Sequence, residues 1–403
     1  MSAFAKSTFN TATYATSRPT YPPRLFEHIF NYYVNGRSRE DGQKDRQWER
    51  AVDVGCGTGQ ATSHLTGRFK NVVCVDPSAG MLQKARDHLV VNSRSDPQAP
   101  NTHFSFVQGS AEDLHAALPE DGSVDLLIAA QACHWFDWTK VWPETRRVLR
   151  KGSGVAAYWV YGEIRLTNFP SLTPLITEFW QGPEPQSGGS NSGVPKSLGA
   201  YFQRPGRTIL ERLLVDVPSP SSVLGASDCG LTDFQRAYFT DEKSLIPPLD
   251  ASESNSLTQA VQHPTLMRFS WRWIDILGYV RTTSALHSYH EKFPEDLQSP
   301  NDTRFLERDL ADVKSFNDSL EKQSGGENMT ATLDPVFVGG GDIVMRFWKD
   351  LREGARRELL ESAKLDTTGG DDDSGVASTK RTDATLDVLG SSFTFLSIVS
   401  AVN

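Results

Sequence analysis

Residues 51–60 read AVDVGCGTGQ and place Gly55, Gly57 and Gly59 at alternate positions directly after an apolar run. An apolar run that ends in a glycine-rich turn is typical of the first strand and loop of a nucleotide-binding α/β fold. The dinucleotide fingerprint G-x-G-x-x-G has its third glycine one residue later than this stretch does. The stretch therefore predicts a parallel sheet with a ligand site at its first loop, but not the usual dinucleotide site.

The residue Asp53 narrows the choice of ligand, because it lies two positions before Gly55. A carboxylate at the mouth of the loop would repel a pyrophosphate and attract a cation. An adenosine compound with no phosphate and a free ammonium group fits better, and S-adenosylmethionine is such a compound. A nicotinamide cofactor, and with it an oxidoreductase, is the disfavoured alternative.

The chain from residue 48 to 162 alternates short apolar runs with helical ones, which indicates βαβ units and a parallel sheet. The expected strands are 51–54, 72–75, 104–107, 124–130 and 155–160, and the expected helices are 60–69, 79–90, 111–118 and 139–149. Ligands bind beyond the carboxyl ends of such strands. Polar residues that follow the strands are therefore the candidates for the site.

The second half of the chain reads differently, as aromatic-rich helical pieces separated by inserts rich in Pro, Gly, Ser and Asp. Helical pieces are expected at 172–180, 208–215, 269–290, 304–320 and 343–364, and loops at 183–198, 216–231, 246–264, 321–341 and 366–383. The run 386–402 is β-branched and aromatic and predicts a strand that returns to the sheet. We expect an N-terminal arm and helix over 1–47, a cofactor-binding core over 48–162, a helical cap with insertions over 163–382, and a last strand over 383–403.

Composition excludes several classes of protein. The 403 residues carry a formal net charge of −9, which argues against a nucleic-acid partner. Four scattered cysteines without a CxxC pair favour reduced thiols and a cytoplasmic location. No apolar run approaches the ~20 residues of a membrane span, and no cluster has metal-ligand spacing, so we expect neither a membrane nor a metal partner. A monomer or homodimer is expected.

Two further positions support the choice of S-adenosylmethionine. Asp76 ends the second strand about twenty residues after the loop, where a carboxylate can accept both ribose hydroxyls. Residues 109–113 follow the third strand, where the adenine amino group would lie, although Ser110 could equally be a helix cap. The expected cofactor-binding residues are Asp53, Gly55, Cys56, Gly57, Thr58, Gly59, Asp76, Pro77, Met81, Ser110, Ala111, Glu112 and Gln131.

The sequence resembles the Rossmann-like S-adenosylmethionine-dependent methyltransferases through its motif DVGCGTG at 53–59. It is more narrowly similar to the fungal group related to trans-aconitate and cantharidin-detoxifying methyltransferases, through Phe9, YATSRPTYP at 14–22 and HWF at 134–136. Weaker likenesses lie at 206–207 and 278–285. The resemblance implies an α/β fold with a mostly parallel seven-stranded sheet and helices on both faces. Thr283 stands where the group has tryptophan, and the inserts lengthen the chain.

The resemblance also implies that the N-terminal arm is a lid over the cofactor and a small-molecule substrate. His134 and Arg18 are then the candidate catalytic residues, and the candidate substrate-binding residues are Tyr14, Tyr21, Trp135, Tyr161 and Arg281. A purely structural role is the alternative for these residues. The arm residues would then pack on the domain, His134 would be a buried histidine or a helix cap, and Arg281 would be a surface charge. Trp271, Trp273 and Tyr279 have helical spacing and are expected in the core.

The predicted function is methyl transfer to a small molecule, with a carboxylate oxygen favoured as the acceptor. A carboxylate is ionised at neutral pH and needs no base, but it must be held, for which arginine is suited. A phenol, alcohol or amine acceptor, as in secondary metabolism, would need a base, and His134 is the candidate. A non-catalytic cofactor-binding module is the remaining alternative.

Overall fold

The computed structural model describes residues 18–35, 48–93, 102–184, 195–241, 260–324, 334–367 and 389–402. Five parallel strands form the centre of its sheet, in the order β3-β2-β1-β4-β5. They are β1 (Arg50–Val54), β2 (Asn71–Asp76), β3 (His103–Gln108), β4 (Leu126–Ala130) and β5 (Val155–Trp159). The five predicted strands and the Rossmann-like core are thus confirmed.

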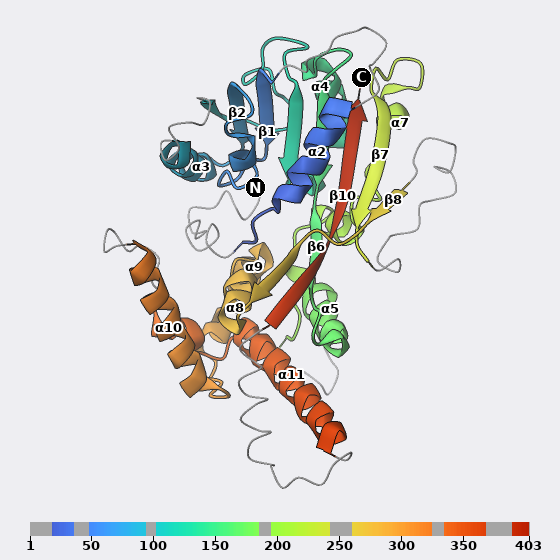
Figure 1. The fold of residues 1–403 in the computed structure, drawn as a ribbon. Coiled ribbons are helices and arrows are strands. Elements are labelled where there is room, and N and C mark those ends of the chain that lie inside the picture. Colours follow the sequence, from blue (N-terminus) through green and yellow to red (C-terminus); the bar gives the residue numbers. More distant parts are fainter. Residues whose placement is uncertain are drawn as a thin grey trace.

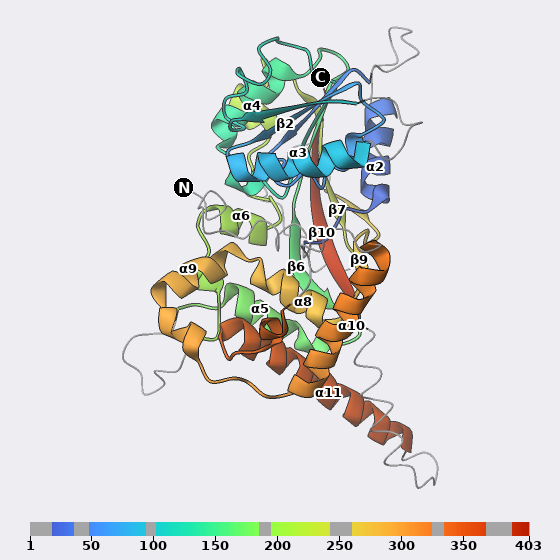
Figure 2. The ribbon, with the colours of Figure 1, turned by 90° about the vertical axis from the view of Figure 1, so that its left-hand side faces the viewer.

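Helices cover both faces of this parallel sheet, which explains why its strands are apolar on both sides. Ala51 of β1 faces a core shared with α2 (Pro23–Asn35) and α3 (Ala79–Ser93). The neighbouring Val52 faces the other core, which is shared with α4 (Trp138–Val148). Figure 2 shows α3 and α4 on opposite sides of the strands.

Two helices expected in the core are not formed. The segment 60–69 contains only the short 3-10 helix η2 (Thr62–Leu65), because the glycines on either side, Gly59 and Gly67, have φ values of 84° and 73°. The segment 111–118 is a series of turns, in which the amide of Leu114 donates to the side chain of Glu144 at 2.8 Å instead of forming a helical bond.

The predicted seven-stranded sheet is wrong for this chain, since the described strands form a ten-stranded sheet. The strand β10 (Leu389–Val402) is antiparallel to β5 on one side and to β7 (Thr232–Phe239) on the other, and β8 (Ala260–His263) continues the sheet beyond β7. Fourteen residues of strand extend about 45 Å. The start of β10 therefore reaches past the core and pairs with β6 (Tyr161–Leu166) and β9 (Arg268–Trp271).

The remaining helices, except α7 (Pro220–Leu224), lie together beyond this end of the sheet, below the parallel strands in Figure 1. We call this part the cap, whereas α7 packs on α4. The α-helices of the cap are α5 (Thr173–Gln181), α6 (Gly206–Glu211), α8 (Trp273–Arg281), α9 (Ser284–Lys292), α10 (Leu306–Ser324) and α11 (Ile343–Thr367). Its 3-10 helices are η4 (Pro170–Leu172), η5 (Gly199–Tyr201), η8 (Pro294–Gln298) and η9 (Pro335–Val338). Two strands differ from expectation: β8 lies in an expected loop, and β9 overlaps an expected helix, whereas no element was predicted for the segment of β7.

A buried ion cluster joins α10 to α11. The carboxylate of Asp309 accepts from both Lys349 and Arg352, and all three side chains are almost fully buried. The three charged groups are desolvated, so the removal of one member would leave the others buried without a counter-ion. The contact between the two helices therefore depends on all three residues.

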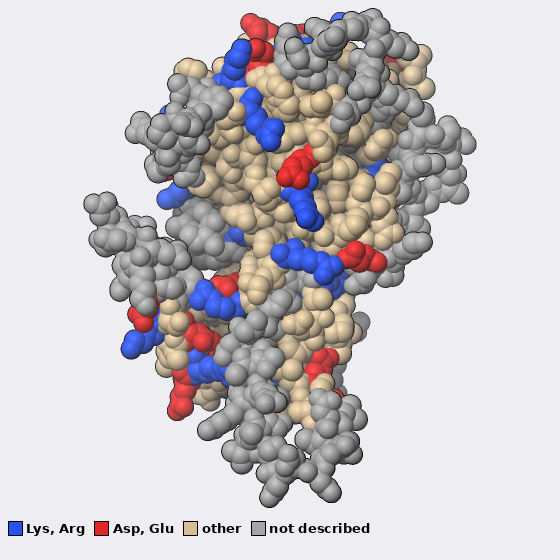
Figure 3. Space-filling model, in the orientation of Figure 1, with Lys and Arg blue, Asp and Glu red and all other residues tan. Residues whose placement is uncertain are grey.

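On the side of the molecule shown in Figure 3, lysine and arginine side chains are interspersed with acidic ones among the described residues. None of the described helices has the length and hydropathy needed to cross a bilayer.

Candidate cofactor and substrate site

A cavity of about 410 Å³ lies at the carboxyl edge of the parallel strands, between them and the cap. This volume is within the range of sites for small molecules and cofactors. From the core and arm it is lined by Arg18, Tyr21, Gly55, Cys56, Gly57, Thr58, Gln60, Ala61, Asp76, Pro77, Ser78, Met81, Ala130, Gln131, Ala132, His134, Trp135, Phe136, Tyr161 and Gly162. From the cap it is lined by Trp180, Phe202, Gln203, Arg207, Leu210, Tyr279, Thr283 and Ser284.

The glycine loop forms one wall of the cavity, and the structure requires glycine at its positions for different reasons. Gly55 and Gly57 both have positive φ values, of 73° and 55°. A Cβ on Gly55 would lie 2.4 Å from the Cβ of Ala132, so the loop packs directly on the segment after β4. A Cβ on Gly57 would meet no atom within 4 Å and would project into open space. Gly57 therefore exposes backbone where a ligand can approach closely.

Asp76 lies at the end of β2 and lines the same wall. Its Oδ2 accepts from the amide of Gly57 at 2.9 Å, and its Oδ1 accepts from the amide of Ser78 at 2.8 Å. Burial raises the pKa of Asp76, and these two amide hydrogen bonds oppose that rise. Each carboxylate oxygen can accept a second hydrogen bond. The geometry therefore fits a carboxylate that holds a pair of ligand hydroxyls.

Asp53 and Gly59 do not line the cavity, contrary to our expectation of an anion at its mouth. Asp53 is fully buried beneath the loop, where its Oδ2 accepts from the hydroxyl of Thr62 at 2.6 Å. Burial raises the pKa of Asp53 to about 7; the hydrogen bond from Thr62 opposes this shift, and Asp76 adds to it. A Cβ on Gly59 would lie 3.2 Å from Leu89, so this glycine allows α3 to pack against the loop.

The residues expected near the adenine are also outside the cavity wall. Ser110 forms an isolated bridge with Asp113, and Ala111 is buried in the core on the α4 side. The Oε1 of Glu112 accepts from the amide of Asp137 at 3.0 Å. This segment thus supports the start of α4.

Gln131 has a special role at the end of β4. Its φ of 55° is in the left-handed region, which is unusual for a residue other than glycine. Its side-chain Oε1 accepts from the amide of Tyr161 at 3.0 Å. The side chain therefore fixes the start of β6 beside the end of β4, and such backbone strain is often found at binding sites.

His134 and Trp135 follow in the 3-10 helix η3 (Cys133–Trp135), on the substrate side of the cavity. Burial, together with the guanidinium groups of Arg207 and Arg18, lowers the pKa of His134 to about 3. The imidazole is therefore neutral at physiological pH and a weak base. Its Nδ1 has no hydrogen-bond partner among the described residues.

The N-terminal arm reaches the cavity through Arg18, which joins the core to the cap. Its guanidinium donates to the hydroxyl of Tyr161 at 3.3 Å and to the carbonyl of Thr282 at 3.1 Å. It also lies 5.1 Å from the ring centre of Tyr279. Tyr21 lines the cavity too, whereas Tyr14 lies outside the described residues.

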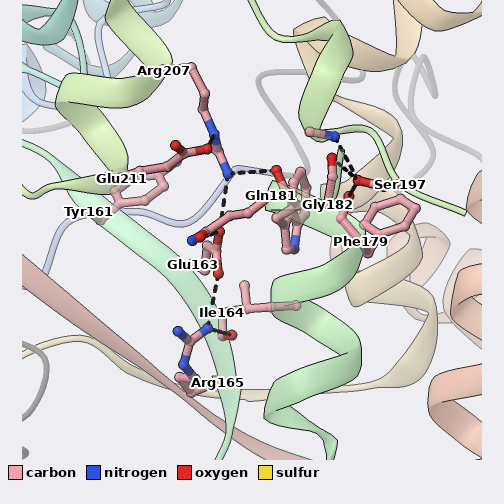
Figure 4. A network of polar contacts seen from close by, with 12 residues as sticks. Tyr161, Glu163, Ile164, Arg165, Phe179, Gln181, Gly182, Ser197, Arg207 and Glu211 are labelled. Carbon is pink, nitrogen blue, oxygen red and sulfur yellow. Dashed lines mark hydrogen bonds and ion pairs between the residues drawn. The ribbon is translucent and has the colours of Figure 1, made fainter. Parts of the chain in front are cut away.

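The cap contributes Arg207, which we did not predict as a site residue. Its Nε donates to Glu211 at 2.8 Å, and its Nη2 donates to Glu163 at 3.2 Å and to the carbonyl of Trp180 at 3.3 Å (Figure 4). The ring of Phe202 lies 4.0 Å from the guanidinium carbon. The only sequence signal was the weak likeness at 206–207.

Two other positions in the cap were singled out from the sequence. Arg281 does not line the cavity, because it forms an ion pair with Asp342 at 3.1 Å. Tyr279 is buried in the core as expected, as is Trp273, and it also lines the cavity. A helical pattern of aromatic residues predicts that a ring is buried, but it does not show whether the ring also borders a cavity.

Among the described residues, one group has the spacing of metal ligands: Asp113, His115 and Glu144. It does not line the cavity, and the oxygens of Glu144 already accept from Arg147 and from the amide of Leu114. It therefore adds nothing to this site.

Comparison with known proteins agrees with the geometry. Residues 52–157 match the family model described as a methyltransferase domain. The probable S-adenosylmethionine-dependent methyltransferase CRG1 of Saccharomyces cerevisiae is 29% identical over 177 residues, 44% of this chain and 54% of that protein. The trans-aconitate 2-methyltransferase of Deinococcus radiodurans is 33% identical over 138 residues, 34% of this chain and 46% of that protein. Methyltransferase ptaI of Pestalotiopsis fici is 30% identical over 150 residues, 36% of this chain and 41% of that protein.

These similarities span about half the length of the curated relatives. The family model covers the part of the chain that holds the glycine loop, Asp76 and His134. The open space at Gly57 and the carboxylate at the end of β2 fit the same assignment. Residues 52–157 of this chain are therefore similar to the methyltransferase domain, and the cavity beside them fits S-adenosylmethionine as the cofactor.

Proposed function

We propose that this protein transfers a methyl group from S-adenosylmethionine to a carboxylate oxygen of a small molecule. The observation that carries the proposal is a single cavity wall shared by a glycine loop, a strand-end carboxylate, an arginine and a histidine. When bound, S-adenosylmethionine would supply an electrophilic methyl group. The residues of the chain then have to hold the acceptor, orient it and exclude water.

The core side of the cavity would hold the cofactor. Gly57 leaves room for the ligand, and Asp76 offers two carboxylate oxygens for ribose hydroxyls. Pro77 and Met81 line the wall beside Asp76, and Gln131 and Ala132 line it at the end of β4. Both strands present these groups at the carboxyl edge of the sheet, where ligands of open α/β folds bind.

The cap side and the arm would hold the acceptor. Arg18 lines the cavity, and its guanidinium donates to the hydroxyl of Tyr161 and to the carbonyl of Thr282. A guanidinium can hold a carboxylate in a defined direction and leave one oxygen for reaction. An arm that joins core and cap would also keep water away from the reacting atoms.

A carboxylate acceptor is favoured because His134 is a poor base. Its pKa is lowered to about 3, so it would take a proton from a phenol, alcohol or amine only weakly at neutral pH. A carboxylate is already ionised at that pH and needs no base. The neutral imidazole can still form a hydrogen bond to the acceptor.

Two measurements test the proposal. Calorimetry should detect binding of S-adenosylmethionine, and a screen with methyl-labelled cofactor against small acids, phenols and amines should label acids preferentially. With an acid found in this screen as the acceptor, Arg18→Lys should lower turnover strongly while cofactor affinity falls much less. The reason is that lysine lacks the forked geometry of the guanidinium. Cofactor binding without methyl transfer to any acceptor would instead indicate a binding module. Exclusive labelling of phenols or amines would refute the carboxylate.

A further inference from the structure

We propose that Arg207 forms a second polar subsite, in which its guanidinium donates to an additional oxygen atom of a planar aromatic acceptor. This inference rests on the proposed function, because it concerns the acceptor side of the same cavity. It goes beyond that function by naming the chemical class of the acceptor and a donor other than Arg18.

Arg207 has one guanidinium nitrogen, Nη1, that donates to none of the described residues. Of its three guanidinium nitrogens, Nε and Nη2 donate to Glu211, Glu163 and the carbonyl of Trp180. Among the described residues nothing accepts from Nη1, although the side chain is only 9% exposed and lines the cavity. The two glutamates fix the orientation of the guanidinium, so Nη1 is a preorganised donor.

The ring of Trp180 lies beside this donor in the same wall. The guanidinium carbon of Arg207 is 5.8 Å from the ring centre of Trp180, and both residues line the cavity. A donor without a partner in a largely buried wall is costly unless something that binds there accepts from it. A guanidinium nitrogen only donates, so the partner must be an acceptor such as an oxygen.

The rest of the cap wall is aromatic, which indicates the shape of the acceptor. The ring centre of Trp180 lies 6.0 Å from that of Phe202 and 6.1 Å from that of Tyr279. Trp135 closes the wall on the core side, packed so closely on Gly206 that a Cβ there would lie 2.4 Å from its ring. Aromatic faces bind planar rings well by stacking and edge contacts. A flat aromatic acid with a second oxygen would fit the aromatic walls and accept from the free donor of Arg207.

The charge balance favours an uncharged second oxygen, such as a carbonyl, over a second carboxylate. Arg207 is already paired with Glu163 and Glu211. Its positive charge is therefore largely compensated, and the remaining N–H groups act as hydrogen-bond donors more than as a charge.

The test compares probes that differ only in that oxygen. Binding of 3- and 4-acetylbenzoate to the full chain is measured by calorimetry, with and without S-adenosylhomocysteine, against 3- and 4-isopropylbenzoate. An acetyl compound should bind about tenfold to hundredfold more tightly than its isopropyl counterpart, the effect of one hydrogen bond to a charged donor. Arg207→Met should remove this preference and leave binding of the isopropyl compound nearly unchanged.

The matched control is Arg204→Met. Arg204 also pairs with Glu211, at 3.2 Å, but it is 46% exposed and does not line the cavity. This variant should keep the preference. If Arg207→Met fails to fold, Arg207→Lys keeps a positive charge beside the glutamates and should still lose the preference.

Equal binding of both probe types, binding of neither, or a preference that survives both Arg207 variants would overturn the subsite. The proposed function fails separately, by absence of S-adenosylmethionine binding or methyl transfer. A protein that binds the cofactor and methylates an aliphatic acid, but binds no benzoate, would retain the function and lose this inference.

Discussion

The amide of Gly57 donates to Oδ2 of Asp76 over 2.9 Å, although the two residues are 19 positions apart in the sequence. This bond ties the loop after β1 to the end of β2, so that the open side of Gly57 and the carboxylate face one cavity. The proposed cofactor site is thus one unit made by two neighbouring strands.

Asp76→Ala should weaken binding of S-adenosylmethionine about tenfold to hundredfold, because hydrogen bonds to a charged acceptor are lost. Titration calorimetry on wild type and variant measures the change. Asp350→Ala, a change on the surface of α11, is the control and should leave the affinity unchanged. An unaltered dissociation constant in a folded Asp76 variant would remove this residue from the site.

Gly57→Ala and Gly55→Ala should fail in different ways. At Gly57 the new methyl group meets no protein atom, so the variant should fold with only the modest strain of a left-handed alanine, roughly 1 kcal/mol, and lose cofactor affinity. At Gly55 the methyl group would collide with Ala132, so the variant should also lose stability. Thermal unfolding and cofactor titration of both variants check this. Equal melting temperatures for the two variants would contradict it.

Stability should depend on pH through Asp53. Its pKa is raised to about 7 in the folded protein, so the folded state holds this proton more tightly than the unfolded state does. The stabilisation from Asp53 is complete below pH ~4, the ordinary pKa of an aspartate, and is lost as pH rises toward 7. Relative to wild type, Asp53→Asn should therefore gain stability between pH 5 and pH 8. Urea unfolding of both proteins at the two pH values measures it, and an unchanged difference would show that Asp53 does not titrate in this range.

Thr283→Phe should fill the acceptor side of the cavity without touching the cofactor side. Thr283 lines the cavity, and its hydroxyl donates to the carbonyl of Val280 at 2.6 Å. We expect at least a tenfold loss of methyl transfer with cofactor affinity within about twofold of wild type. Thr283→Val removes the same hydrogen bond with little change in volume and serves as the control. If both variants lose the same activity, the hydrogen bond matters and the volume does not.

Asp309→Ala should destabilise the cap by about 3–5 kcal/mol, because it leaves Lys349 and Arg352 buried without a counter-ion. Asp350→Ala breaks an ion pair with Arg304 at the surface and should cost less than about 1 kcal/mol. Urea unfolding provides both values. Similar losses in the two variants would mean that the buried cluster is not the stronger link.

Local sequence was sufficient for the five parallel strands and for the glycine loop. Continuous apolar runs indicate strands buried on both faces, and alternate glycines indicate the positive φ values found at Gly55, Gly57 and Gly59. The same local signal placed Asp76, His134 and Trp135 at the carboxyl edge of the sheet, where the cavity is. These features depend on interactions between residues that are close in the chain or on the regular order of βα units.

Only the tertiary structure decided the acceptor side. Arg207 lines the cavity, while Arg281 is occupied by Asp342, 61 residues further along the chain. Both are arginines on cap helices, and no local pattern separates them. Asp53 does not face the cavity, because its carboxylate is buried beneath the loop. The sheet grew to ten strands because β10 pairs with segments more than 100 residues before it. Burial and long-range pairing depend on which surfaces meet after folding, and that is not encoded in any short stretch of the sequence.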